Sequence, residues 1–426
     1  MRSTRILQAL FLVLALLAIA VVSARATRAA DFRVYYYASR VLIEHQGQLY
    51  GPSSGIGWPQ YFRYPPLFLL VFLPFALLPY KVAAVVWVAL KCAVLYAVVR
   101  ALARRLDFPQ TGFWWLVPLL LCGGFVAQEF GLGNAQFLVF GLVAASLLAL
   151  QRHKRQSAFL LAFAASLKVW PLFFVPYLAA RRQARVALLT VVFIGALILL
   201  PAAYFGWSGN LSLLRQWFAQ EWSTSGLGED AWFPSQSLSG VLQRYLTVMD
   251  YSKWPDSNYL QLHILNLETP VVLSIWLILA ASAYVGLLWL AHKGPTTVAR
   301  GTPFFLTDAL AFCALPLLEP FAHRIALVVL LWPAVVAGAL LARPGFPSAR
   351  SKLLIWVAVV IEGIQPLVPG ARMQRLFQVL GLDFWAACIL TAGLLLAWME
   401  WQRVDGTRFS GEKLPSLANY ELTPNR

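Results

Sequence analysis

A single carboxylate, Asp31, follows the first long apolar run of the chain and opens the stretch DFRVYYYASRVLIE over residues 31–44. Helical spacing gathers apolar side chains on one side of this stretch, which predicts an amphipathic helix lying in the plane of the membrane interface. That side comprises Val34, Tyr35, Ala38, Val41 and Leu42. Asp31 would stand at the start of the helix, where a carboxylate can either accept a proton in a reaction or cap the helix.

Tyrosines surround Asp31 in this part of the sequence. They are Tyr35, Tyr36, Tyr37, Tyr50 and Tyr61. Aromatic rings at the outer boundary of a membrane can stack on sugars or settle as an interfacial belt. An interfacial belt of tyrosines would not require a carboxylate. Asp31 therefore has two interpretations, a catalytic base or a helix cap.

Three basic residues are candidates for binding an anion. Lys168 lies between two apolar stretches, where a membrane-embedded lysine is often functional but can also extend its ammonium group to the interface. His323 follows a Glu-Pro pair at the outer end of an apolar run, and it is either a functional group or an ordinary interfacial histidine. Arg324 is either a further cation of the same site or the flank of the next helix.

Five more polar residues complete the set of candidate substrate or donor-phosphate contacts. Asn134 and Gln136 can hydrogen-bond sugar hydroxyls, although a cap of the helix that follows them is the favoured interpretation. Arg244, which follows Gln236 in a long polar segment, is a candidate cation, and a solvated surface arginine is the favoured alternative. Tyr36 is the candidate among the tyrosines.

The elements that position these residues must be membrane helices. The chain has 426 residues, of which 60% are hydrophobic and 12% charged, and its mean hydropathy of +0.68 exceeds that of soluble domains. Several apolar runs approach the length that crosses hydrocarbon, and backbone groups in lipid can be satisfied there by helices. We therefore predict an all-α, polytopic bundle of about eleven to thirteen transmembrane helices.

The basic residues indicate the topology. The net charge of +16 comes from short clusters between apolar runs, the pattern expected for cytoplasmic loops, and no soluble segment collects these charges into a nucleic-acid-binding face. Residues 25–64 and 206–268 then form external loops; the second carries six acidic and three basic residues. We expect one membrane domain over 1–401, with an uncleaved first span, and a cytoplasmic tail over 402–426.

Two segments are too short or too interrupted for simple spans. Residues 64–79 are bracketed by prolines and can dip into the membrane without crossing it. Residues 158–180 are interrupted at Lys168-Val169-Trp170-Pro171, which predicts a helical hairpin with Lys168 at its middle.

No metal or cofactor is predicted. The five histidines are scattered, and the chain contains neither an HExxH nor an Asp-x-Asp motif. A transferase that uses a soluble sugar nucleotide would normally hold a metal through Asp-x-Asp, so its absence favours a metal-independent reaction on a lipid monophosphate. The four cysteines lie in apolar segments without metal-like spacing.

A series of motifs resembles glycosyltransferase family 87, the membrane mannosyltransferases that take sugar from a polyprenyl phosphate. Asp31 with Tyr36 and Ala38 opens the series, and the others follow in order: GQLYG, FRYPPLFLLVFLPFALLP, GLGNAQ, SLKVWPLFF, PSQSLSGVLQR and EPFAHRIALVVLLWPA. The order and spacing carry the resemblance more than any single motif. The chain departs from the family where a tryptophan often precedes the histidine, and residues after 342 match nothing in it.

The resemblance implies a GT-C membrane fold whose active site opens at the outer face, with Asp31 as the acidic base in the first external loop and His323 in contact with phosphate. Attack by a sugar or inositol hydroxyl at an anomeric carbon needs one carboxylate to accept a proton. A phosphate leaves as an anion and needs positive charge or donors, whereas a glycoside oxygen must be protonated by a second acid. One aspartate with several cations therefore fits a lipid-phosphate donor better than hydrolysis.

The leading hypothesis is a plasma (inner) membrane enzyme with an external active site. It would transfer a hexose, mannose first among the choices, with inversion, from a polyprenyl-phosphate donor to a hydroxyl of a lipid or lipid-linked glycan acceptor. One alternative is a transporter or lipid flippase that uses Lys168, Asp308 and Glu362 as internal charges. Another is a membrane scaffold for envelope assembly without catalysis.

Overall fold

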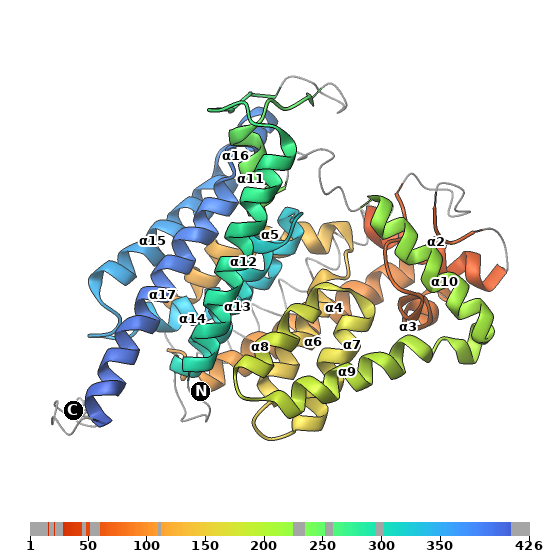
Figure 1. Ribbon diagram of the computed structural model, residues 1–426, viewed down its shortest axis with the longest axis horizontal. Helices are drawn as coiled ribbons and strands as arrows, with labels where there is room; N and C mark the ends of the chain where they lie inside the picture. The colour runs from red at the N-terminus through yellow and green to blue at the C-terminus, as the bar shows by residue number, and fades with distance from the viewer. Residues whose placement is uncertain are drawn as a thin grey trace.

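The chain is described here by a computed structural model, shown as a ribbon in Figure 1. The structure describes residues 29–44, 48–51, 60–109, 112–224, 235–251, 259–294 and 302–409, together with Leu16 and Val21. These residues form α-helices and short 3-10 helices joined by turns, so the all-α prediction is confirmed. The predicted first span lies outside the described residues except at Leu16 and Val21.

The helices of the N-terminal half are α2 Ala30–Glu44, α3 Pro66–Ala76, α4 Tyr80–Arg105, η2 Gly112–Trp115, α5 Leu116–Leu132, α6 Gln136–Ala149, α7 Lys154–Leu167, η3 Trp170–Phe173, α8 Phe174–Ala180, α9 Ala184–Leu199 and α10 Ala202–Thr224. In this half, α2 packs on α3, α6 on α7, and α9 on both α7 and α8. In Figure 1, α2, α3 and α10 lie at one end of the molecule.

The helices of the C-terminal half include α17 Leu382–Phe409, which is the longest helix in the described chain. They are α11 Leu238–Leu246, α12 Thr269–Lys293, α13 Thr302–Leu318, η5 Arg324–Leu330, α14 Leu331–Leu341, α15 Ala349–Ile364, η6 Gln365–Leu367, α16 Ala371–Leu380 and α17 Leu382–Phe409. Figure 1 shows α15 and α17 side by side at the end opposite to α2 and α10.

The protein is a multi-pass membrane protein. Among the described residues, five helical segments are long and apolar enough to cross a bilayer: Tyr80–Arg105, Gly112–Leu132, Thr269–Lys293, Arg324–Leu341 and Leu382–Arg403. A sixth candidate is the pair α9 and α10, which meet at a bend of 92°. Four shorter apolar helices accompany them, so the count of eleven to thirteen spans stays a prediction.

Two predicted boundaries differ from the observed elements. The polar segment 206–268 is not a simple loop, because α10 and α11 lie within it. The predicted tail from Gln402 begins inside α17, which continues to Phe409 because no proline interrupts its last turns. The amphipathic helix that was predicted for residues 31–44 is present as α2.

The predicted break at Lys168 is present. Helix α7 ends at Leu167, and Lys168 adopts an extended backbone with φ of −152° and ψ of 141°. Pro171 lacks a backbone N–H, and it lies in the first turn of the short η3, where a helix needs no internal donor; the chain then continues as α8. The backbone break lets Lys168 leave the helical face of α7.

Helix α2 is fixed by an aromatic cluster and by one close backbone approach. The rings of Phe32 and Tyr35 lie against Phe72 and Trp87, with centroids 5.6–6.3 Å apart. Trp87 also donates its indole N–H to the Gly133 carbonyl at 2.9 Å. A Cβ on Gly133 would lie 2.5 Å from the Phe32 Cβ, so only glycine lets the α5–α6 turn approach α2 this closely.

Replacing this glycine is expected to separate the two elements. Gly133 has φ of +70°, so Gly133→Ala adds backbone strain to the clash with Phe32 and should destabilise the protein by about 2 kcal/mol or more. The loss is measured by thermal unfolding in detergent. Gly131→Ala is the matched control, because a Cβ there meets nothing within 4 Å. Equal stability of the two variants would contradict this account.

Candidate active site

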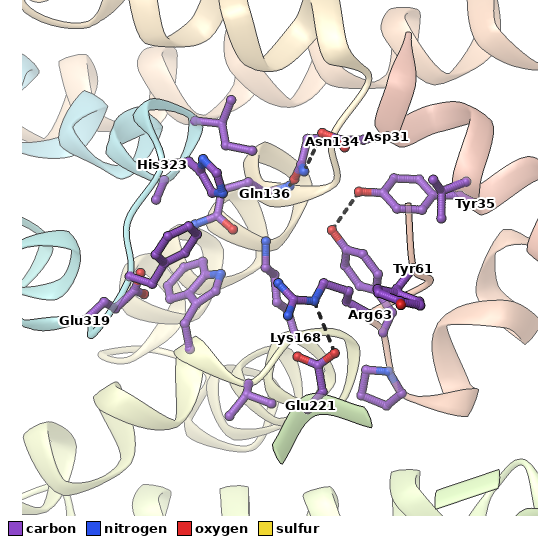
Figure 2. Close-up of a pocket in the computed structure, with 18 of the residues that line it drawn as sticks. Asp31, Tyr35, Tyr61, Arg63, Asn134, Gln136, Lys168, Glu221, Glu319 and His323 are labelled. Carbon is purple, nitrogen blue, oxygen red and sulfur yellow. Dashed lines mark hydrogen bonds and ion pairs between the residues drawn. The ribbon is translucent and has the colours of Figure 1, made fainter. Parts of the chain in front are cut away.

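A polar cavity of about 540 Å³ lies where α2, the α5–α6 turn, the Lys168 break, α10 and the segment before η5 meet. Figure 2 shows Asp31 and Asn134 on one wall and His323 with Glu319 on another, while Arg63 and Lys168 extend toward the middle. The structure therefore brings together five of the predicted site residues: Asp31, Asn134, Gln136, Lys168 and His323.

Asp31 is partly buried in the first turn of α2, as predicted. Its Oδ2 accepts a hydrogen bond of 2.9 Å from the Asn134 side-chain amide. Burial raises the pKa of the Asp31 carboxyl above its ordinary value, while the Asn134 hydrogen bond and the charges of Lys168 and Lys91 act in the opposite direction. A carboxylate in this setting is more basic than one in water.

Asn134 has two functions in the local structure. Its Oδ1 accepts a hydrogen bond of 2.8 Å from the Gln136 backbone N–H, so the side chain satisfies the first N–H of α6 as predicted, although the N-cap position itself is Ala135. Capping orients the amide so that its N–H₂ group faces Asp31. The Gln136 Oε1 is buried and has no hydrogen-bond partner among the described residues, so it remains available to a hydroxyl in the cavity.

Lys168 brings a positive charge to the cavity. Within the described parts of the chain its Nζ makes no hydrogen bond or ion pair, and it lies 5.5 Å from the centre of the Tyr64 ring. Tyr64 is itself held by a 2.6 Å hydrogen bond between its hydroxyl and that of Tyr35. An ammonium group that forms no direct ion pair with a carboxylate is suited to receive an anionic ligand.

His323 lies in the segment between α13 and η5, with its ring edge-on to Phe321 at 4.5 Å between centroids. Burial lowers the pKa of His323 to about 4, and the charges of Lys168 and Arg63 act in the same direction. The imidazole is therefore neutral at physiological pH. It can donate a hydrogen bond to a phosphate oxygen, but it adds no positive charge before an anion is present.

Three further charged residues in the cavity were not predicted as site residues. Glu319, part of the EPFAHR motif, lies near Lys168; burial raises the pKa of its carboxyl and the Lys168 charge opposes the rise. Arg63 and Glu221 form an ion pair of 3.5 Å on another wall. Their positions depend on α10, whose contact with the 60–64 segment has no signal in the sequence.

Helix α10 holds that wall through backbone contacts. Gln220 donates to the Phe62 carbonyl at 2.8 Å and accepts from the Gly51 N–H at 2.7 Å. Trp217 donates its indole N–H to the Arg63 carbonyl at 3.2 Å. These hydrogen bonds fix Gly51, Phe62 and Arg63 against α10.

Two predicted residues lie nearby but do not line the cavity. Arg324 points away and forms an ion pair of 2.7 Å with Asp383 of α17. Tyr36 lies on the opposite side of α2 from the cavity and donates to the Leu78 carbonyl at 2.9 Å. The sequence distinguishes neither orientation, because both depend on partners at least 42 residues away.

Gln236 and Arg244 also lie outside the cavity, and Arg244 is not a solvated surface residue. Arg244 is completely buried and donates to the carbonyls of Val379 and Ser235 at 2.9 and 2.7 Å. Gln236 donates its side-chain amide to the Gln378 carbonyl and its backbone N–H to the Ala322 carbonyl, at 2.9 and 2.7 Å. These residues therefore fasten the segment that carries His323 to the α16–α17 connection.

Two of the three charges named for a transporter, Asp308 and Glu362, are engaged within the bundle. Asp308 is ion-paired with Arg181 and accepts a 2.7 Å hydrogen bond from Tyr177. Glu362 accepts from the Gln365 amide at 3.2 Å. Among the residues that the structure describes, no three His, Cys, Asp or Glu side chains are grouped as metal ligands would be, and metal independence stays a prediction.

Comparisons with known proteins identify the family. The chain matches the sequence model of glycosyltransferase family 87 over residues 62–304, more than half of its length. The matched range includes Asn134 and Lys168, begins after Asp31 and ends before His323. No curated protein matches the chain. Among solved structures, the crystal structure of ArnT from Cupriavidus metallidurans bound to undecaprenyl phosphate aligns with a TM-score of 0.39 and 15% identity, over 98% of this chain and 81% of that one.

The neutral His323 predicts a pH effect on stability. The pKa of His323 is about 4 in the folded protein and 6.5 in the unfolded chain. The neutral imidazole therefore contributes to the free energy of unfolding above pH 6.5, and this contribution is lost as the pH falls toward 4. Over that window the wild type should lose up to about 3 kcal/mol relative to His323→Gln, measured by thermal unfolding. The exposed His292→Gln is the control, and parallel pH curves for wild type and His323→Gln would refute the assignment.

Proposed function

Since the chain belongs to glycosyltransferase family 87, we propose that it transfers a hexose, mannose first among the candidates, from a polyprenyl-phosphate donor to a hydroxyl of a lipid or lipid-linked glycan acceptor. The observation that carries the proposal is one cavity in which the Asp31 carboxylate lies across from Lys168 and His323. We place the active site on the external side of the plasma (inner) membrane.

The proposed reaction is a single displacement. Asp31 accepts the proton of the acceptor hydroxyl while its oxygen forms a bond to the anomeric carbon. The bond from that carbon to the donor phosphate oxygen breaks, and the lipid monophosphate leaves with the electron pair. Attack opposite to the leaving group inverts the anomeric centre.

The cavity residues suit the two ends of this reaction. The raised pKa of Asp31 makes it a better proton acceptor, and the Asn134 amide holds one carboxylate oxygen so that the other remains free. At the other end of the reaction the leaving phosphate gains negative charge, which a nearby positive charge would stabilise. Lys168 supplies an ammonium group there, and His323 supplies a neutral hydrogen-bond donor whose protonation the anion would favour.

A lipid donor also needs an apolar surface next to the polar site. A groove of about 350 Å³ between η3, α12 and α13 shares Val169, Trp170 and Glu319 with the polar cavity. Its other lining residues are Phe173, Leu277, Ala280, Ala281, Tyr284, Leu315 and Leu318. We assign this groove to the first prenyl units of the donor, because it meets the cavity beside Lys168, where the phosphate would bind.

Removing the base should abolish transfer. Asp31→Asn keeps the hydrogen-bonded shape but cannot accept a proton, so kcat should fall by about 10³-fold or more while donor binding persists. Purified protein is assayed with radiolabelled polyprenyl phosphomannose. Glu44→Gln, on the same helix in an exposed ion pair with Arg40, should retain activity. The proposal fails if Asp31→Asn transfers sugar at the wild-type rate, or if no polyprenyl phosphohexose serves as a donor.

Filling the apolar groove should weaken the binding of long donors. Ala281→Trp places a large ring in the groove and is expected to raise KM for a long-chain polyprenyl phosphosugar about tenfold, with a smaller effect on a short-chain analogue. Ala283→Trp, on the same helix but outside the groove, is the matched control. Equal effects of both substitutions on both donors would contradict this placement of the prenyl chain.

A further inference from the structure

We propose that the buried ion pair between Lys91 and Glu129, which lies outside the cavity, positions the Asn134 amide against Asp31 and thereby sets the rate of the transfer reaction. The two residues are positioning residues, since neither lines the cavity. The proposal rests on the proposed function only for its kinetic readout. Its structural part, that the pair holds the α5–α6 turn, can be tested without any transfer assay.

The pair is completely enclosed. Both side chains are fully inaccessible to solvent, and the Lys91 Nζ lies 2.9 Å from the Glu129 Oε2. The same Nζ lies 5.8 and 5.2 Å from the ring centres of Trp87 and Phe130. The ammonium group of α4 is therefore held between one carboxylate and two aromatic faces at the end of α5.

Glu129 connects this charge pair to the turn that follows it. Its Oε1 accepts a hydrogen bond of 2.9 Å from the Phe137 backbone N–H, in the first turn of α6. Its backbone carbonyl accepts from the Asn134 N–H at 3.2 Å. One residue thus holds both the end of α5 and the start of α6, leaving residues 133–136 little freedom to rotate.

The fixed turn directs several groups toward α2. Asn134 donates to Asp31 at 2.9 Å, and the Ala135 N–H donates to the Tyr35 hydroxyl at 3.3 Å. Gly133 lies in contact with Phe32, and its carbonyl is held by Trp87, one turn before Lys91 on α4. A rotation of the turn would therefore withdraw the Asn134 amide from Asp31 and would at the same time break the hydrogen bond between Ala135 and Tyr35.

The energetics of buried charge favour a positioning role over a stabilising one. Removing two charges from water is costly, and an apolar pair of similar size is often as stable or more stable. What an apolar pair cannot supply is the directed hydrogen bond from Glu129 to the start of α6. The Lys91 charge also lowers the pKa of Asp31, which keeps the carboxylate ionised at a lower pH.

The test replaces the pair while leaving no buried charge alone. In Lys91→Met/Glu129→Leu we expect a folded protein whose kcat for sugar transfer is reduced about 10–100-fold with little change in KM. The acidic limb of the pH profile should also move to higher pH. The control is Arg181→Met/Asp308→Leu, which removes a second buried ion pair that does not line the cavity and should leave kcat unchanged.

A double-mutant cycle with Asn134→Ala distinguishes positioning from general damage. If the pair acts through Asn134, its loss in the Asn134→Ala background should lower kcat less than about twofold further. Fully additive losses, or an equal loss of kcat in the Arg181/Asp308 control, would overturn the proposal.

Amide hydrogen exchange gives a readout that does not depend on activity. The Lys91/Glu129 replacement should increase exchange in a peptide covering residues 132–138 and leave one covering 176–182 unchanged. Unchanged exchange in the first peptide would overturn the proposal even if transfer is impaired. A wild type without transfer from any donor would instead count against the proposed function, and the exchange result would still decide the role of the pair.

Discussion

The Asp31 carboxylate in the wall of the polar cavity is the constraint on which the rest of the site depends. It has to be buried enough to be basic and yet close enough to donors and cations to hold a negative charge. Burial raises its pKa, while the Asn134 amide, Lys91 of α4 and Lys168 at the break after α7 offset part of that rise. The hydrogen bond between Asp31 and Asn134 joins two elements that are 103 residues apart in sequence.

Several local breaks in helical geometry serve this arrangement. The left-handed Gly133 ends α5 and brings its turn against α2, and the extended Lys168 ends α7 so that its side chain enters the cavity. The bend of 92° between α9 and α10 brings α10 back over the segment that carries Arg63. Regular helices supply the scaffold, and the irregular points between them bring Asn134, Lys168 and Arg63 to the cavity.

Local sequence was sufficient to predict some of these features but not others. The Lys-x-x-Pro spacing predicted the break at Lys168, and polar residues before an apolar run predicted the Asn134 cap. Arg244 and Gln236 were assigned to substrate, yet they hold backbone carbonyls of Val379 and Gln378, more than 130 residues away. Glu319 escaped assignment because its importance lies in its proximity to Lys168, which no local pattern encodes.

The groove beside Lys168 has a consequence for how substrates would exchange. It borders the polar cavity through Glu319, and Leu277 and Ala281 of α12 are exposed along it. Under the proposed function, a spent carrier would leave sideways into the surrounding leaflet and a fresh one would arrive by the same route. Turnover would then respond to the two-dimensional density of carrier in the bilayer rather than to its concentration in bulk water, so accumulated carrier phosphate would compete with the donor inside the membrane itself.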